Sequence, residues 1–427
     1  MNLMSTSPVR VALVGYGNAG RIFHAPLVSG MPGLALRCIV SSKPETVAGD
    51  WPAVPVAATP QQAFADPEID LVVIATSNQS HHPLAKEALL AGKHVVVDKP
   101  FTVTLAQAED LLAVARAQER VLTVFQNRRW DADFLALRQV LASGKLGRIV
   151  HFESHFDRYR PDVPSRWRDD DLPGSGLWFD LGAHVVDQAL QLFGCPEDLQ
   201  LDLALQRDGA RTNDYFHAQL RYGSRDSGLR VILHGSALVP ALGPRFTVHG
   251  TLGSFVKYGL DTQEDALKAG GRPQWNGQGG TLGDWGRDPL VGEVVRHVDG
   301  QAKAEPAPDV AGNYLAFYAQ LLAHLRGQAP VPVKATEAHQ LMALLSRGEA
   351  SARHGHRVST ADLREDTRKK AERDAAAGRL EGGDRQHRKR MATIGAVYDA
   401  DPAPRRPHDI ITLAKPPTTK PRSVTLS

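Results

Sequence analysis

The residue of this chain best placed to do chemistry is a lysine that comes directly after a strand-like run. Val95–Val97 leads into Asp98, Lys99 and Pro100, and a glycine-rich turn of sequence GYGNAG occupies positions 15–20. In a doubly wound parallel sheet, ligands collect outside the carboxyl ends of the strands. A lysine at that edge faces the ligand crevice, where an amine can take the proton of a bound hydroxyl group. The alternative interpretation is an ordinary surface lysine, and the position after a core strand argues against it.

The glycine-rich turn indicates dinucleotide binding because it follows a strand and opens a helix. Gly15 makes the turn, Gly17 lets a pyrophosphate approach, and Gly20 allows close packing of helix and strand. Backbone N–H groups at the start of the helix would then meet the phosphates. We expect Tyr16 and Asn18, the intervening residues of the motif, to lie beside the cofactor as well. A tight turn without a ligand is the alternative.

The residues after the second strand indicate which nicotinamide cofactor is used. About twenty residues beyond the glycine motif, an NAD-binding unit usually carries Asp or Glu for the ribose 2′-hydroxyl. This chain has Ser41, Ser42 and Lys43 there, and its first carboxylate is Glu45. Hydroxyl groups and a cation suit a 2′-phosphate, which a carboxylate would repel. NADP is therefore the expected cofactor, and NAD stays open as the alternative because Glu45 could turn back toward the ribose.

A helix expected over Gly176–Phe193 carries a narrow polar stripe on an otherwise apolar surface. At about 100° per residue, four polar side chains fall within a stripe about 60° wide: Asp180, His184, Asp187 and Gln191. Such a helix is buried, so its stripe must face a partner group or a water-filled cleft. We prefer a catalytic carboxylate–imidazole pair. A structural hydrogen-bond network and a metal site are the alternatives, and no cysteine or second histidine pair supports the metal.

Strands and helices alternate over residues 9–126, and this alternation predicts a parallel sheet with helices on both faces. The expected strands are nearly continuous in apolar residues: Val9–Val14, Leu34–Val40, Leu71–Ala75, Val95–Val97 and Val121–Phe125. The expected helices have helical spacing of apolar residues: Ala19–Ser29, Ser80–Ala91 and Leu105–Gln118.

From about residue 148 the strand candidates follow one another with few helices between them. They are Ile149–Phe156, Leu199–Gln206, Tyr215–Tyr222, Leu229–Ser236 and Phe246–Gly250. A second helix is expected over Gly312–Arg326. This order predicts an α+β domain with a mainly antiparallel, open sheet. We expect a homo-oligomer, a dimer or a tetramer, to form through the open face, since an apolar sheet face rarely stays exposed.

Length and composition exclude several classes of protein. The chain has 427 residues, enough for two domains and an appendage. Lys and Arg number 50 against 47 Asp and Glu, a balance that argues against a nucleic-acid-binding body. Only Cys38 and Cys195 occur, so we expect a reducing, cytoplasmic location without a disulfide framework. No run of about 18 apolar residues and no apolar N-terminal core are present, so we expect neither a membrane span nor a signal peptide.

Beyond about residue 360 the sequence becomes basic and rich in proline. Such a segment cannot bury enough surface to offset its ordering entropy. We prefer a disordered or foreign extension over a nucleic-acid-binding arm, and residues 388–411 resemble a segment of certain insertion-sequence transposases. The expected division is a Rossmann domain over 1–127, a substrate-binding and oligomerisation domain over 128–358, and a tail over 359–427.

Taken together, the motifs resemble the glucose–fructose oxidoreductase, inositol dehydrogenase and rhizopine catabolism (Gfo/Idh/MocA) superfamily over about residues 8–355. The branch of NADP-dependent scyllo-inositol dehydrogenase-like enzymes is the most similar. The resemblance rests on GYGNAG (15–20), SSK (41–43), ATSNQSH (75–81), VVVDKP (95–100), FQNRRWD (125–131), HFESHFDRYRP (151–161) and the run from Arg166 to Gly194. The Glu-Lys-Pro usual in the family is Asp98-Lys99-Pro100 here.

The resemblance implies roles for individual residues. Lys99, Asp180 and His184 would form the catalytic set and contact the substrate. Further cofactor contacts would come from Thr76, Asn78, His81, Lys99, Asn127, Trp167 and Arg168. Further substrate contacts would come from Arg128, His155 and Asp157. Asp187 would support the helix from behind.

These expectations predict an NADP(H)-dependent oxidoreductase of an inositol or a related sugar. Lys99 would act as general acid and base, with His184 and Asp180 beside it. Two alternatives stay open. One is glycoside cleavage assisted by a retained cofactor, which some relatives perform, and the other is a non-enzymatic regulator that senses a dinucleotide. A sensor needs no proton acceptor, so the three polar residues argue against it.

Overall fold

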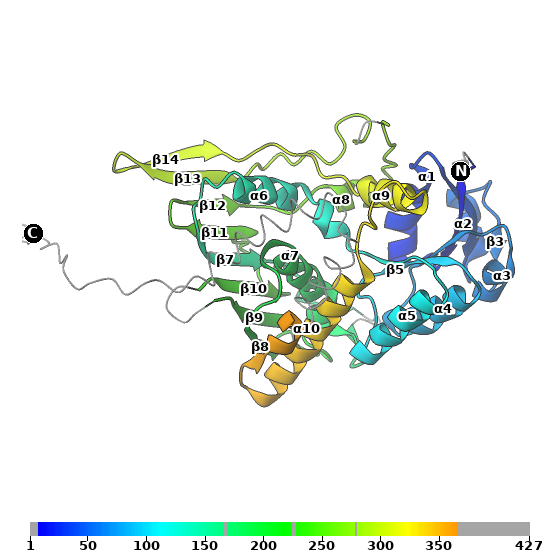
Figure 1. Cartoon of the computed structure of the whole chain (residues 1–427), viewed down its shortest axis with the longest axis horizontal. Helices are drawn as coiled ribbons and strands as arrows, with labels where there is room; N and C mark the ends of the chain where they lie inside the picture. Colours follow the sequence, from blue (N-terminus) through cyan, green and yellow to red (C-terminus); the bar gives the residue numbers. More distant parts are fainter. Residues whose placement is uncertain (1–6, 165–168, 224–227, 278–279, 366–427) are drawn as a thin grey trace, which may run out of the picture.

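The computed structural model describes residues 7–164, 169–223, 228–277 and 280–365. These residues form two sheets with helices packed against them (Figure 1). Within this part of the chain, no helix combines the length and the apolar character needed to cross a bilayer.

The first sheet consists of six parallel strands in the order β3-β2-β1-β4-β5-β6. The strands are β1 (Val9–Val14), β2 (Leu34–Val40), β3 (Val56–Ala57), β4 (Leu71–Ile74), β5 (His94–Asp98) and β6 (Leu122–Phe125). The helices are η1 (Ala19–His24), which continues as α1 (Ala25–Ser29), then α2 (Pro44–Asp50), α3 (Pro60–Ala65), α4 (Asn78–Leu90) and α5 (Leu105–Ala117). The expected doubly wound parallel fold is confirmed, and all five expected strands are present.

The strand order places the ends of β1 and β4 side by side, at the point where the order of the strands along the sheet reverses. Ligands of doubly wound sheets bind at this edge. The glycine-rich turn follows β1, Ser41 follows β2, Lys99 follows β5 and Asn127 follows β6. The central strands are buried on both faces, and every residue of β4 is buried. The sheet therefore presents its polar loops from one rigid edge.

The second sheet has nine strands in the order β14-β13-β12-β11-β7-β10-β9-β8-β15. They are β7 (Ile149–His155), β8 (Asp198–Ala204), β9 (Tyr215–Arg221), β10 (Arg230–Ser236), β11 (Phe246–Gly250), β12 (Gly253–Lys257), β13 (Glu293–Val298), β14 (Gln301–Pro306) and β15 (Val358–Ser359). Within the described residues, only β7 and β10 pair in parallel, and the other neighbouring strands of this sheet are antiparallel. The expected mainly antiparallel sheet is confirmed.

The remaining helices precede, interrupt or follow the strands of this sheet along the chain. They are η2 (Asn127–Trp130), α6 (Ala132–Ala142), η4 (Trp178–Gly182), which continues as α7 (Ala183–Phe193), α8 (Gln263–Lys268), α9 (Leu315–Leu325) and α10 (Ala335–His354). α7 and η4 pack on β10, and α6 packs on β12 (Figure 1). α10 contacts β8 and α7 of the second domain and also α5 and β6 of the first. The expected helix over 176–193 is present as η4 and α7, whereas α10 was not expected.

The nine-stranded sheet has two unlike faces, which we call the covered face and the open face. The covered face packs on η4 and α7 through aromatic side chains: the ring of Phe216 lies 5.4 Å from that of Trp178, and the ring of Phe152 lies 5.2 Å from that of Phe193. The alternate residues of β7, β9 and β10 point to the open face and are only partly buried.

The open face is mainly polar. Its residues on the three central strands include Glu153, His155, His217, Gln219 and His234. The expectation of an apolar open face was wrong, so apolar burial is no reason for self-association through it.

The packed chain extends beyond the expected domain end at residue 358. Ser359 pairs with Asp198 of β8, and the backbone N–H of Thr360 donates to the carbonyl oxygen of Glu197 at 2.9 Å. Thr360 and Leu363 are buried. Most of the expected tail, residues 366–427, lies outside the described part of the chain.

Candidate active site

A cavity of about 270 Å³ lies between the carboxyl edge of the first sheet and the helix formed by η4 and α7. The first sheet contributes Asn18, Lys99 and Asn127 to its lining. The second domain contributes Asp180 and His184 from the helix. The structure therefore brings together the three residues expected to be catalytic, from segments far apart in the sequence.

Lys99 and Asp180 form a direct ion pair across this cavity. The Lys99 ammonium nitrogen Nζ donates to Asp180 Oδ1 at 2.7 Å and to the Asp180 carbonyl oxygen at 2.8 Å. The side chains are 13% and 28% exposed. The Lys99–Pro100 peptide is cis, and the Lys99 backbone N–H donates to Asp98 Oδ1 at 2.8 Å. The lysine is thus held at both its backbone and its amine, with part of its surface open to a ligand.

His184 lies one helical turn after Asp180 and is buried, with 5% of its surface exposed. Burial lowers the pKa of His184 well below its usual range, and the positive charges of Lys99 and Arg128 lower it further. The imidazole is therefore neutral at neutral pH. Among the described residues, its Nδ1 atom has no hydrogen-bond partner. A buried polar atom without a partner carries a free-energy cost.

The start of this helix is fixed by Trp178. Its indole N–H donates to the carbonyl oxygen of Leu345 in α10 at 3.1 Å, and its backbone N–H donates to Asn213 Oδ1 at 2.9 Å. Two glycines make room for the indole: a Cβ atom on Gly182 would lie 2.5 Å from the ring, and one on Gly348 would lie 2.7 Å from it. The helix turn that carries Asp180 and His184 is thus set by packing as well as by its own hydrogen bonds.

Asp187 supports the same helix from behind, as the resemblance implied. Arg129 donates to both carboxylate oxygens of Asp187, at 2.8 Å and 2.6 Å, and to Glu337 of α10 at 2.7 Å. Asp187 and Arg129 are buried. The residues of the expected polar stripe therefore have two different surroundings. Asp180 and His184 line the cavity, while Asp187 binds an arginine in the interior.

The glycine-rich turn has the shape that a dinucleotide requires. Gly15 has a φ of +98°, and a Cβ atom there would lie 2.6 Å from the carbonyl oxygen of Ala75. A Cβ atom on Gly20 would lie 2.0 Å from the carbonyl oxygen of Gly15. Nothing described lies within 4 Å of a Cβ atom placed on Gly17. The first and third glycines are thus required for packing, and the second leaves open space where a pyrophosphate can approach.

Ser41, Ser42 and Lys43 lie beyond the end of β2, next to the glycine-rich turn. Ser41 Oγ accepts a hydrogen bond from the Lys43 backbone N–H at 3.0 Å. Ser42 and Lys43 are exposed, as is Glu45 in the first turn of α2. Across the described residues, no carboxylate lies within ion-pair distance of the Lys43 ammonium group. The cation is therefore available to an anionic ligand.

Three of the expected cofactor contacts bind the protein itself. Asn78 Nδ2 donates to the carbonyl oxygen of Gly174 at 2.8 Å, and the His81 ring lies 2.9 Å from the carbonyl oxygen of Pro100. Thr76 Oγ1 accepts from Ser80 Oγ at 2.7 Å. None of the three lines the cavity. His81 instead fixes the backbone that carries Lys99, which helps to position the ion pair.

Tyr16 does not line the cavity either. Its hydroxyl group donates to Asp50 Oδ2 at 2.9 Å, and burial together with this carboxylate raises its pKa to about 12. The neighbouring residue Asn18 does line the cavity.

Arg128 lines the cavity, as expected, and is held by three groups. It forms ion pairs with Glu264 and, at 3.4 Å, with Asp131, and it donates to the Tyr314 hydroxyl group at 3.3 Å. Arg158 also lines the cavity and was missed. Its guanidinium carbon lies 5.0 Å from the centre of the Phe156 ring, and burial lowers its pKa. The signal for Arg158 was its place just beyond the expected strand 149–156.

His155 and Asp157, expected to contact the substrate, do not line the cavity. They alternate along the chain with Phe156, whose ring lies 6.4 Å from that of His184. The side chains of His155 and Asp157 therefore lie on the open face, opposite the cavity. Trp167 and Arg168 lie outside the described residues.

Comparisons with known proteins agree with this geometry. Residues 9–126 match a family model described as "Oxidoreductase family, NAD-binding Rossmann fold". Residues 138–360 match one described as "Oxidoreductase family, C-terminal alpha/beta domain". Both models belong to the Gfo/Idh/MocA family, and they cover the two sheets described above.

The matches to individual relatives extend over nearly the whole length of those relatives. The uncharacterized oxidoreductase YdgJ of Escherichia coli (strain K12) is 52% identical over 81% of this chain and 97% of its own. The scyllo-inositol 2-dehydrogenase (NADP(+)) IolW of Bacillus subtilis (strain 168) is 36% identical over 81% of this chain and 94% of its own. The solved structure of the YPO2259 protein of Yersinia pestis is 49% identical, with a TM-score of 0.78 over 84% of this chain and 99% of its own. The chain belongs to the Gfo/Idh/MocA family of oxidoreductases, with an NAD(P)-binding Rossmann domain followed by the family's C-terminal domain.

Proposed function

We propose that this protein is an NADP(H)-dependent dehydrogenase that interconverts a secondary alcohol and a ketone of an inositol or a related sugar. The observation that carries the proposal is the 2.7 Å pair between Lys99 and Asp180, with neutral His184 beside it, at the edge of an NAD(P)-binding sheet. When bound, the nicotinamide supplies the acceptor or donor of the hydride. The protein must supply the proton acceptor and must orient the hydroxyl group.

Each residue of the cavity has a role in this proposal. In the direction of reduction, the Lys99 ammonium group gives its proton to the oxygen that forms from the carbonyl group. In the direction of oxidation, the neutral amine takes the hydroxyl proton. Asp180 holds the amine in place and orients it, and the His184 ring binds the reacting hydroxyl group through a nitrogen. The glycine-rich turn and the start of η1 hold the phosphates of the cofactor.

Polarity supports a polyol as the substrate. The lining includes Asn127, Arg128, Arg158, Asp180 and Glu264, which offer hydrogen-bond donors and acceptors on several sides. A sugar-like ring with many hydroxyl groups can satisfy such a lining, whereas an apolar substrate would leave its groups without partners. The similarity to a protein named as a scyllo-inositol 2-dehydrogenase supports the same class.

NADP is the proposed cofactor because Lys43 and Ser42 are exposed next to the glycine-rich turn. A 2′-phosphate placed there would meet a cation and hydroxyl groups. The Bacillus subtilis relative is named as an NADP(+)-dependent enzyme, which supports this choice.

The proposal is tested by following reduced nicotinamide absorbance with the purified chain, NADP or NAD, and a panel of inositols and aldoses. We expect reduction of NADP with at least one inositol, and loss of the signal in Lys99→Met. Release of an aglycone from a glycoside without net NADPH would support the glycoside-cleaving alternative instead. If no polyol or glycoside reacts although the cofactor binds, the dehydrogenase proposal is wrong.

A further inference from the structure

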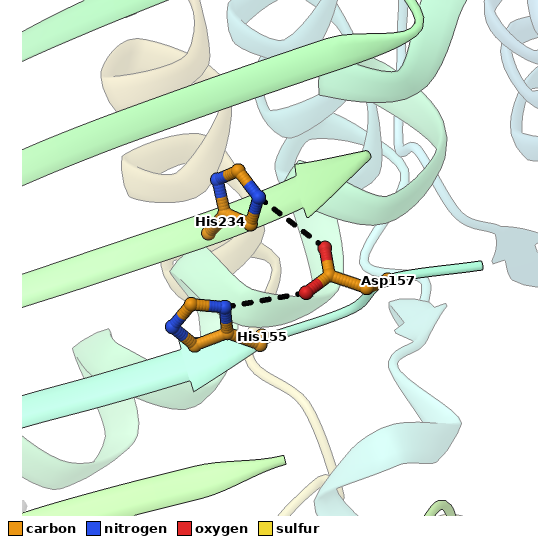
Figure 2. A group of neighbouring side chains, drawn as sticks. All are labelled: His155, Asp157 and His234. Atoms are coloured by element: carbon orange, nitrogen blue, oxygen red, sulfur yellow. Dashed lines mark hydrogen bonds and ion pairs between the residues drawn. The ribbon is translucent and has the colours of Figure 1, made fainter. Parts of the chain in front are cut away.

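Two histidines and an aspartate meet on the open face of the second sheet, behind the cavity (Figure 2). His155 ends β7, Asp157 follows it, and His234 lies on the adjacent strand β10. His155 and His234 are directly paired in the register of these two strands. We propose that these three side chains form a binding site for a divalent transition-metal ion of the zinc class.

The spacing of the three side chains suits such an ion. His155 Nδ1 lies 3.3 Å from Asp157 Oδ2, and His234 Nε2 lies 3.4 Å from Asp157 Oδ1. All three ligand atoms lie within 4.8 Å of one another. Zinc bonds of about 2.0–2.2 Å in a tetrahedron place neighbouring ligand atoms about 3.3–3.6 Å apart. Each histidine nitrogen already has this separation from one oxygen of Asp157, His155 from Oδ2 and His234 from Oδ1, so the carboxylate can offer either oxygen to an ion between the two rings.

Groups around the triad hold the ligands in a suitable form. Glu153 Oε2 lies 3.1 Å from His155 Nε2. When that ring nitrogen carries its proton and donates to the carboxylate, Nδ1 presents its lone pair toward Asp157 and His234. A carboxylate behind a ligating histidine is a common feature of metal sites. The Ser236 backbone N–H donates to Asp157 Oδ1 at 3.1 Å, which fixes the third ligand.

The types of ligand atom indicate which class of metal ion binds. Two imidazole nitrogens and one carboxylate suit zinc and its neighbours in the transition series, while Mg²⁺ and Ca²⁺ prefer oxygen ligands. The side chains are 27%, 8% and 15% exposed for His155, Asp157 and His234 respectively. An ion can therefore reach the site from solvent and still be partly shielded from it. The competing explanation is a metal-free ion pair, in which a charged His155 bridges Glu153 and Asp157.

The site lies one residue away from the cavity. Arg158 lines the cavity on the covered face, directly after Asp157 on the open face, and its backbone N–H donates to the Ser236 carbonyl oxygen at 2.9 Å. A bound ion would join β7 to β10 where they support Arg158 and Phe156. This role is structural, and it does not depend on which alcohol the protein oxidises.

The test uses the full-length, untagged chain after removal of metals with EDTA. Calorimetric titration with Zn²⁺ should find one site per chain, and Co²⁺ should give the visible absorption of a cobalt ion with nitrogen ligands. His234→Ala and Asp157→Asn should each weaken Zn²⁺ binding at least tenfold and abolish the cobalt absorption. Zn²⁺ should also raise the melting temperature of the unmodified chain more than that of either variant.

Two controls separate the triad from other histidines. His249→Ala removes an open-face histidine stacked on His151, and the double variant His354→Ala/His356→Ala removes a second stacked pair. Both should bind Zn²⁺ like the unmodified chain. Asp157→Asn keeps nearly the same shape, so it carries the test if His234→Ala does not fold. Unchanged binding in Asp157→Asn, or equal loss in the controls, would overturn the proposal.

Discussion

The covered and open faces of the nine-stranded sheet use the same kinds of side chain in opposite ways. On the covered side, His184 is buried near Phe156, and burial lowers its pKa well below the usual range. On the open side, the hydrogen bond to Asp157 raises the pKa of His155 against the opposing effect of burial. A histidine that stays neutral can bind a hydroxyl group. A histidine between two carboxylates is stabilised in its protonated form, and in its neutral form it can bind a metal ion.

This difference shows that the side of the sheet on which a polar residue lies determines its neighbours and therefore its protonation state. Phe156 and Asp157 are neighbours in sequence, yet only Phe156 points toward the helix that carries His184. Side chains alternate between the two faces of a strand. A motif such as HFESHFDRYRP therefore supplies residues to two separate sites. The predictions below test how far the two faces act independently.

The largest expected effect is a loss of turnover for a change in the cavity, compared with no loss for a change on the open face. Lys99→Met should lower turnover by about 10²–10⁴, the range for loss of a positioned acid–base group. Cofactor affinity should change much less, because the glycine-rich turn holds the phosphates. His217→Ala on the open face should leave turnover unchanged. Steady-state kinetics and cofactor titration of the two variants check this. Near-normal turnover of Lys99→Met would move the proton acceptor elsewhere, with His184 the first suspect.

The second prediction compares buried and exposed ion pairs. Arg129→Met leaves Asp187 and Glu337 without their partner behind the helix that carries Asp180 and His184. Removing one member of a buried pair costs about 3–5 kcal/mol, and turnover should fall with stability. Arg211→Met breaks the exposed pair with Asp170 and should cost far less. Urea unfolding of both variants gives the comparison, and equal losses would contradict it.

The third prediction changes cofactor choice without touching either face of the second sheet. The unmodified chain should use NADP at least tenfold more efficiently than NAD, a difference of about 1.4 kcal/mol. Ser42→Asp should shrink or reverse this ratio by placing a carboxylate beside the 2′-phosphate. The KM for the alcohol should stay the same. Kinetics with both cofactors measure the ratio, and equal use of both by the unmodified chain would refute NADP preference.

The fourth prediction uses pH to test the burial of His184. Its pKa is lowered in the folded protein, while the unfolded chain takes up that proton near pH 6.5. The unfolded state therefore binds more protons below about pH 6.5, so the free energy of unfolding falls as pH falls. One such group accounts for up to about 1.4 kcal/mol per pH unit. His184→Asn should lose less stability between pH 7.5 and pH 5.5, and an equal loss in urea unfolding would speak against a neutral, buried ring.

The smallest expected effect concerns the C-terminal segment. Deletion of residues 366–427 should leave the melting temperature and turnover nearly unchanged, because the composition of that segment does not favour a packed core. Deletion from residue 359 should lower the melting temperature, because it removes Ser359, which pairs with Asp198 of β8, and the buried residues Thr360 and Leu363. Thermal unfolding of both deletions checks the difference. A large loss from the shorter deletion would show that the segment contributes to folding or activity.

Local rules predicted the first domain well. Val9–Val14 and Leu34–Val40 are strands with the expected bounds, because buried parallel strands are nearly continuous in apolar residues. α10 was missed although it has 20 residues. Its sequence contains Gly348 and several polar side chains, so its helical spacing is weak. Its packing against Trp178 depends on segments far away in the chain.

The residues of the candidate site could also be predicted only in part. Lys99 at a strand end and Asp180 and His184 on one side of a helix could be predicted because strand ends and helical spacing are local properties, whereas their meeting in one cavity depends on how the two domains pack. Asn78 and His81 were assigned to the cofactor, yet their side chains bind backbone carbonyl groups. Sequence gives the place of a side chain on an element, and only the packed structure gives its partner. His155 was misplaced for a related reason, since its face depends on where the helices pack.

α10 has a consequence for motion. This helix contacts α5 and β6 in one domain and α7 and β8 in the other, and its Leu345 carbonyl accepts the indole N–H of Trp178. Hinge opening of a cleft needs a few residues that can absorb large backbone rotations, and a continuous helix packed on both sides provides none. Opening of the cleft by domain rotation would have to break the contacts of α10 with one of the two domains, so we expect this helix to resist such opening.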